Sequence, residues 1–127
     1  MNWKQEAIGI LEKHSAQKQA LVAMSLERER LALAAPYPRN RNQMLAHLVA
    51  EQTLQQKYQQ TALLVQRTEC ALAALTETER QLLEYLYIIP RHGNQKILMH
   101  LQGICKSTLY RRRDLALQKF TVALYGS

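Results

Sequence analysis

Residues 105–114 read CKSTLYRRRD and place lysine, two hydroxyls, a tyrosine and three successive arginines within one short stretch. Hydroxyls and cationic side chains bind phosphate oxygens, and the arginine fork can hold two acceptors on the edge of one guanine. Three successive arginines on a helix point in three directions, so they cannot share one role. The stretch is therefore either a solvated charged face or a surface shaped to meet a polyanion.

The distribution of charge separates these two readings. The chain of 127 residues has 17 Lys and Arg against 10 Asp and Glu, a net charge of +7, which favours a polyanionic partner. Between Arg91 and Lys119 there are seven basic residues and one acidic residue, Asp114, whereas the charges elsewhere nearly cancel. A solvated charged face needs no such focusing, so the pattern favours contact with DNA.

The elements around this stretch are expected to be three helices. Thr76 and Glu79 fit a capping box that begins a helix ending at Pro90. A turn over residues 91–94 follows, and Asn94 is expected to cap a short helix over residues 95–101. Gly103 ends that helix, and a last helix runs from Lys106 or Ser107 to Leu124. The order helix, short helix, Gly-Ile turn and longer helix is the outline of a helix-turn-helix.

The last helix is expected to have an inner and an outer face. The inner face holds Leu109, Arg113 or Ala116, Phe120 and Leu124, and the opposite face holds Lys106, Ser107, Tyr110, Arg111 and Asp114. The N-terminal residues of the second helix of such a motif enter the major groove. Arg111 is then the candidate for reading a base and Arg112 for binding phosphate. Arg113 either extends across the module or pairs within it.

The first half of the chain is expected to form a long antiparallel helical hairpin. Apolar residues at helical spacing predict helices over residues 3–33 and 43–75, separated by a break with two prolines over residues 35–42. The apolar stripes are interrupted by polar residues, so we expect the hairpin to pair with a second copy, with a solvated spacer as the alternative. The predicted organisation is all-α, with residues 1–70 for dimerisation or spacing and residues 71–127 for DNA binding.

Other functional classes lack a pattern in the sequence. The four histidines are scattered without a carboxylate or thiol at ligand spacing, and no nucleophile motif or glycine-rich phosphate loop is present. We therefore expect no enzyme activity, no metal and no cofactor. Cys70 and Cys105 are expected to be small apolar fillers in a reducing compartment. Without a signal peptide or an apolar span, the protein is expected to be cytoplasmic and not to bind membranes.

The segments LTETERQLLEYLY and QGICKSTLYRRRDLALQKF resemble the region-four helix-turn-helix of sigma factors. The version most similar occurs in small phage late-gene transcriptional regulators of the ArpU and RinA type. The resemblance covers residues 71–125, and it departs at Cys105, where a serine N-cap is usual. It implies a sequence-specific regulator acting in a bacterial host cell, with double-stranded DNA as partner and RNA polymerase as a further candidate partner. The DNA-contacting residues that it implies are Lys106, Ser107, Thr108, Tyr110, Arg111 and Arg112.

Two alternatives remain open at the level of sequence. A phage terminase small subunit would also be helical, would bind packaging-site DNA and would form a ring. A helical protein-interaction adaptor would carry its basic face incidentally. An adaptor should have an unbroken apolar stripe along its exposed helices, whereas the stripes here are interrupted by Gln, His and Arg.

Overall fold

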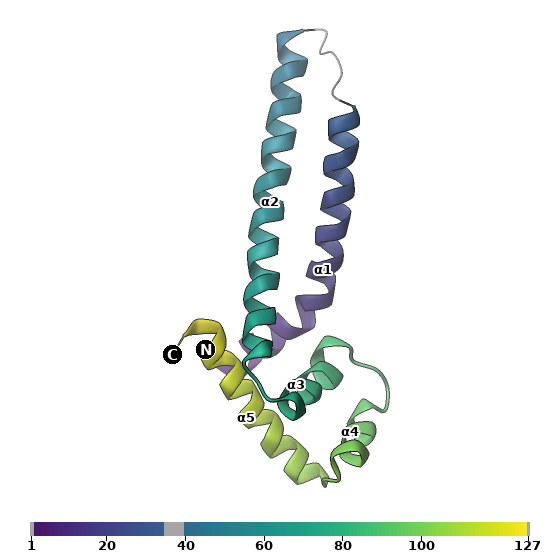
Figure 1. Cartoon of the computed structure of the whole chain (residues 1–127), viewed down its shortest axis with the longest axis vertical. Coiled ribbons are helices and arrows are strands. Elements are labelled where there is room, and N and C mark those ends of the chain that lie inside the picture. The colour runs from purple at the N-terminus through teal and green to yellow at the C-terminus, as the bar shows by residue number, and fades with distance from the viewer. Residues whose placement is uncertain (1, 35–39, 127) are drawn as a thin grey trace. The chain divides into compact units, whose positions relative to one another are not determined.

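A computed structural model describes residues 2–34 and 40–126, and among these no residue lies in a strand. The predicted all-α class is therefore confirmed. The elements in chain order are α1 (Trp3–Leu33), α2 (Arg41–Ala73), α3 (Glu77–Leu83), the π-helical segment η1 (Glu84–Ile88), α4 (Asn94–Gln102) and α5 (Lys106–Tyr125) (Figure 1).

The helix bounds follow the local signals in the sequence closely. Asn40 accepts a hydrogen bond from the backbone N–H of Gln43 at 2.8 Å, which is the N-cap pattern that starts α2. Both bonds of the predicted capping box are present at α3, between Thr76 and Glu79. Residues 35–39 of the predicted proline-rich break lie outside the described residues. The π-helical turn at the end of the third helix was not foreseen.

The chain divides into two compact units. The composite unit consists of Met1–Ser15 together with Gln66–Ser127, and the two-helix unit consists of Ala16–Val65. This division does not follow the expected boundary between residues 70 and 71. The first turns of α1 and the end of α2 belong to the same compact unit as α3, η1, α4 and α5.

The reason for this division is the hydrophobic core of the composite unit. Ala7 and Leu11 of α1 are almost completely buried in one cluster with residues of α2, α3, α4 and α5. The other members of the cluster are Ala71, Leu72, Leu75, Leu82, Leu83, Leu98, Leu109, Ala116, Leu117 and Phe120. A fully buried leucine contributes roughly 1.5–3 kcal/mol through removal of apolar surface from water. The N-terminal residues are therefore part of the platform that holds α5.

Polar contacts join the same segments within the composite unit. The Lys4 ammonium lies 3.2 Å from the Asp114 carboxylate of α5. The Ser15 hydroxyl donates a hydrogen bond to the carbonyl of Ile88 at 3.1 Å, where η1 ends. These contacts bring the beginning of the chain against both α5 and η1, and no local sequence pattern predicted either of them.

The two-helix unit has a different interior. Its parts of α1 and α2 run in opposite directions (Figure 1). The Arg28 guanidinium lies 5.2 Å from the centre of the Tyr58 ring. Apolar side chains such as Leu21, Met24 and Leu54 are only half-buried. Among the described residues of this unit, Val65 alone is buried. Two helices with so little buried apolar surface gain little stability from packing against each other.

Candidate nucleic-acid interface

The turn between α4 and α5 has a tight geometry that needs glycine. Gly103 adopts a left-handed conformation, with φ 63° and ψ 40°, and its N–H bonds the carbonyl of His100 at 3.3 Å. The N–H of Ile104 bonds the carbonyl of Met99 at 3.0 Å, and its side chain packs against the core. A residue with a Cβ would cost about 1–2 kcal/mol in this conformation. The Gly-Ile pair therefore sets where α5 begins.

The start of α4 differs from the expectation. Asn94 was predicted to cap this helix, but it is the first helical residue, and Gly93 at φ 85° holds the cap position. The Asn94 amide instead donates to the carbonyls of Tyr85 at 2.8 Å and Ile89 at 3.0 Å. These carbonyls belong to the preceding segment, so the Asn94 amide ties that segment to the first turn of α4.

The inner face of α5 is the one that its spacing predicted. Leu109, Ala116 and Phe120 are completely buried, and Leu124 is half-buried. Leu117 joins them in the core. This apolar face fixes the rotation of α5, and it leaves Lys106, Ser107, Tyr110 and Arg111 exposed to solvent.

Arg113 forms an ion pair with Asp114 inside the composite unit, which is one of the two roles expected for it. Its guanidinium lies 3.0 Å from the Asp114 carboxylate and 4.9 Å from the centre of the Tyr110 ring. Burial alone would raise the pKa of Asp114, but hydrogen bonds from Lys4 and Arg113 outweigh it and lower the pKa. Asp114 was expected on the outer face of α5, yet it is half-buried and serves as the partner of Lys4 and Arg113.

Tyr110 joins α4 to the outer face of α5. Its hydroxyl accepts a hydrogen bond from the Gln95 amide at 2.9 Å, and Lys106 Nζ lies 5.8 Å from the ring centre. The bond from Gln95 and the nearby positive charges lower the pKa of the Tyr110 hydroxyl. The ring is therefore held in place on the surface, where it remains 38% exposed. No local sequence pattern predicted the hydrogen bond from Gln95 to Tyr110.

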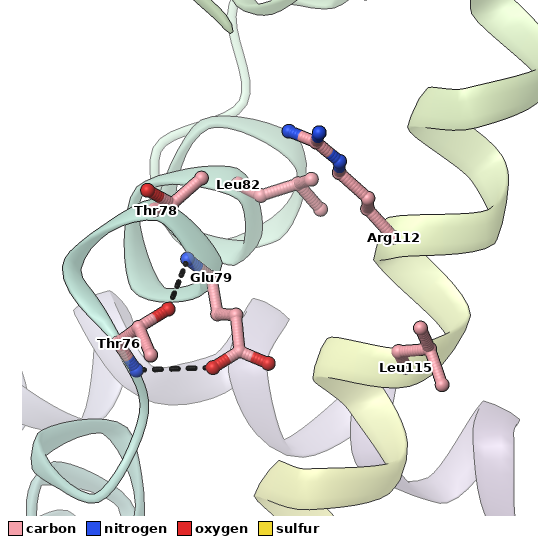
Figure 2. Close-up of a pocket in the computed structure, with 6 residues that line it drawn as sticks. All are labelled: Thr76, Thr78, Glu79, Leu82, Arg112 and Leu115. Atoms are coloured by element: carbon pink, nitrogen blue, oxygen red, sulfur yellow. Dashed lines mark hydrogen bonds between the residues drawn. The ribbon is translucent and has the colours of Figure 1, made fainter.

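Arg112 extends across a shallow pocket of about 220 Å³ between α3 and α5 (Figure 2). Its guanidinium donates to Gln102 Oε1 at 3.4 Å, and the Gln102 amide donates to the carbonyl of Thr78 at 3.3 Å. Both bonds are long and therefore weak. The exposed guanidinium of Arg112 keeps donors for another acceptor, while Gln102 connects the end of α4 to the start of α3.

Arg111 differs from both neighbouring arginines. Its side chain is exposed, and within the described part of the chain it makes no hydrogen bond, ion pair or ring contact. Lys106 and Ser107 lie exposed one turn earlier, while Thr108 is half-buried. Of the six residues predicted to contact DNA, five are exposed on the N-terminal half of α5 and Thr108 is partly covered.

Cys105 occupies the position before α5 where a serine cap is usual. Its Sγ lies 3.2 Å from the hydroxyls of both Ser107 and Thr108 and makes no cap bond to the backbone. Hydrogen bonds from Ser107 and Thr108 lower the pKa of the thiol to about 6. The expectation that Cys70 and Cys105 are buried fillers is wrong, because both are free and exposed.

Two of the seven basic residues between Arg91 and Lys119 form ion pairs inside the composite unit. Lys119 forms an ion pair with Glu79 at 2.9 Å, and Arg113 pairs with Asp114. Burial would raise the pKa of Glu79, but bonds from Lys119 and Thr76 outweigh it and lower the pKa. Within residues 91–119, the cations that stay exposed without an ion pair are Arg91, Lys96, Lys106, Arg111 and Arg112. The net outward charge therefore remains positive on α4 and on the start of α5.

The residues that the structure describes contain neither a membrane-spanning helix nor a cluster of metal ligands. No helix in residues 2–34 and 40–126 is long and apolar enough to cross a membrane. The same residues contain no group of three His, Cys, Asp or Glu side chains placed to hold a metal ion. Comparison of the chain with protein-family models, curated proteins and solved structures finds no match.

Proposed function

We propose that this protein binds double-stranded DNA with a sequence preference, using α4 and α5 as a helix-turn-helix. The observation that carries the proposal is Arg111, an exposed and unpaired arginine on the N-terminal half of α5. The neighbouring arginines are engaged with Gln102 and Asp114, so the three successive arginines have three different surroundings. An uncommitted guanidinium at this position of a second helix suits bidentate contact with guanine.

The surrounding surface supports the same proposal. Lys96 and Lys106 are exposed near the starts of α4 and α5, and Arg91 is exposed in the preceding turn. Basic side chains of this kind contact phosphates, and these contacts fix the register of the motif on the duplex. Tyr110, held by Gln95, and the exposed donors of Arg112 complete a surface on which the predicted DNA-contacting residues lie together.

Within this class, we propose a transcriptional regulator of the phage late-gene type that the C-terminal segments resemble. The basis is the similarity of residues 71–125 to a sigma-factor region-four module, together with the placement of the basic residues on α5. Contact with RNA polymerase and action in a bacterial host cell belong to the same proposal. A terminase small subunit is the competing assignment, and ring assembly on packaging-site DNA would favour it.

The test uses the whole chain, because Ala7 and Leu11 belong to the core that holds α5. The full-length protein is incubated with a random duplex library, and bound DNA is sequenced over several rounds. We expect one enriched motif, whose affinity falls steeply with salt as bound counterions are released. The four exposed cations other than the base-reading Arg111, namely Arg91, Lys96, Lys106 and Arg112, predict a slope of roughly −3 to −4 for each module. Equal affinity for heparin and for all duplexes, without an enriched motif, would contradict sequence-preferring binding.

A further inference from the structure

Tyr110 differs from the basic residues of the outer face of α5, because its hydroxyl already has a protein partner. The Gln95 amide of α4 donates a hydrogen bond to this hydroxyl at 2.9 Å, and the Tyr110 side chain stays exposed. Neither residue carries a charge, so attraction of basic side chains to a polyanion does not account for the pair. The bond holds one polar atom of α5 at a defined place on the surface that we propose to meet DNA.

The direction of this hydrogen bond decides what the Tyr110 hydroxyl offers to another molecule. A phenolic hydroxyl has one O–H donor and lone pairs that accept, and a free hydroxyl rotates to suit either kind of partner. Here the oxygen accepts the N–H of Gln95. In the part of the chain that the structure describes, no protein group accepts the O–H proton of Tyr110. The hydroxyl therefore presents a donor to solvent.

Positive charge around the Tyr110 ring favours the same arrangement. Lys106 Nζ lies 5.8 Å and the Arg113 guanidinium lies 4.9 Å from the ring centre. The bond from Gln95, together with these charges, lowers the pKa of the hydroxyl. A more acidic O–H is a stronger donor, and a hydroxyl that accepts one hydrogen bond donates the next one more strongly.

Buried neighbours fix the positions of both residues. Leu98, one turn after Gln95 on α4, and Leu109, directly before Tyr110 on α5, are completely buried. The left-handed turn at Gly103 joins the two helices. A polar group held in this way discriminates between partners, because a wrong partner leaves the group unpaired and the group cannot turn to compensate.

DNA bases differ in the hydrogen-bonding groups that they present in the major groove. Guanine presents only acceptors, N7 and O6, thymine presents the acceptor O4, and cytosine presents only the N4 donor. A hydroxyl that is free to rotate can contact either kind of edge, so by itself it carries little sequence information. A hydroxyl held as a donor favours guanine or thymine, whereas against cytosine two donors would face each other.

We propose that Tyr110 is a second base-reading residue beside Arg111, and that Gln95 is the positioning residue that makes the Tyr110 hydroxyl a donor. The base at this position presents an acceptor, as guanine and thymine do, and cytosine is rejected. This inference rests on the proposed binding of duplex DNA by α4 and α5. It adds a residue of α4 to the specificity of α5.

The test reverses the hydrogen bond between the two side chains. Gln95→Glu replaces the amide donor with a carboxylate, which only accepts, so the Tyr110 hydroxyl donates to it and presents a lone pair outward. Gln95→Leu removes the partner and leaves the hydroxyl free to rotate. The probes are the duplex selected from the random library and variants of it with each of the four base pairs next to the position whose preference depends on Arg111. Competition binding of the full chain gives the guanine-to-cytosine affinity ratio at each position, in which general repulsion of DNA by the new carboxylate cancels.

We expect the unmodified protein to prefer guanine or thymine over cytosine at one of these positions by roughly 3- to 10-fold, the strength of a single hydrogen bond. Tyr110→Phe and Gln95→Leu should abolish this preference, and Gln95→Glu should reverse it in favour of cytosine. The matched control is Gln66→Glu, the same substitution at an exposed glutamine of α2, which should leave the ratio unchanged.

Thermal unfolding checks the fold of each variant, since neither Gln95 nor Tyr110 belongs to the buried core. An unchanged guanine-to-cytosine ratio in Gln95→Glu would overturn the proposal. Equal weakening of the selected and scrambled duplexes by Tyr110→Phe, without a change in base preference, would also overturn it and place the hydroxyl on a phosphate. In both cases an enriched motif that depends on Arg111 would leave the proposed function intact, whereas the absence of any enriched motif would overturn both.

Discussion

The two units of this protein are built from the same helices in opposite ways. The composite unit collects segments from both ends of the chain around a continuous core that includes Leu11, Leu98 and Phe120. The two-helix unit uses the longest stretches of regular helix, yet among its described residues only Val65 is buried. Helix length therefore says little about self-sufficiency, since most helical stability in proteins comes from packing of an apolar face.

This difference suits the two units to different roles. The composite unit can hold α5 rigidly, which suits a surface whose arginines must keep fixed positions on a duplex. The two-helix unit leaves most of its large apolar side chains exposed, which is typical of a surface that contacts another molecule. Substitutions in the two units should therefore have different consequences, and the following predictions run from the largest expected effect to the smallest.

The largest effect is expected at Leu11, which is fully buried although it lies far in sequence from the core residues of α2, α3, α4 and α5. Leu11→Ala should destabilise the composite unit by about 2–5 kcal/mol, because it removes buried methyl groups and leaves a cavity. Urea unfolding followed by circular dichroism measures the change. The control is Leu64→Ala in the two-helix unit, where the side chain is 48% exposed and we expect a change within about 0.5 kcal/mol. Equal effects of the two substitutions would remove the distinction between the units.

An intermediate effect is expected at the capping box of α3. Thr76→Ala removes the hydroxyl that accepts the N–H of Glu79, and it should cost about 1 kcal/mol of stability. Thr78→Ala is the matched control, because Thr78 is exposed and contributes its backbone carbonyl to the bond from Gln102. Thermal unfolding of both variants tests the prediction. An equal loss for Thr78→Ala would show that the cap does not set the stability of this segment.

The smallest effect is expected at Cys105, where chemistry changes without loss of stability. In a Cys70→Ser variant, alkylation of the remaining thiol by iodoacetamide should follow a titration with a midpoint near pH 6, because Ser107 and Thr108 lower the thiol pKa to about 6. The thiolate, and with it the reactivity, is present above that midpoint and is lost as the pH falls through it. Adding Ser107→Ala should raise the midpoint. A midpoint that Ser107→Ala leaves unchanged would exclude the hydroxyl as the cause.

The sequence predicted the elements of this fold better than their packing. Several helix ends were accessible because proline, glycine and the Thr76–Glu79 pair act through bonds between residues close in sequence. The joining of Leu11 to the C-terminal helices was not accessible, because an amphipathic stripe shows which face is buried and not which distant segment covers it. The reversed role of Asn94 has the same origin, since its acceptors belong to the preceding helical segment.

In the candidate site, too, the features set by local sequence were predicted and the contacts between different helices were not. The exposed face of α5 followed from helical spacing, and the separate position of Arg113 was one of two expected outcomes. The contacts of Tyr110 with Gln95 and of Arg112 with Gln102 join residues of different helices, so no local pattern contains them. The low pKa of Cys105 likewise depends on the orientation of two hydroxyls that only the folded turn defines.

The central claim is that the three successive arginines have three different roles, with Arg111 reading a base. The most direct measurement is the affinity of Arg111→Ala, Arg112→Ala and Arg113→Ala for the selected duplex and for a scrambled one. Arg111→Ala should lose about 1–3 kcal/mol on the selected duplex and much less on the scrambled one. Arg112→Ala should weaken both alike and lower the salt slope by about one, and Arg113→Ala should change binding least. Equal losses on both duplexes for all three variants would contradict the claim and show a nonspecific basic surface.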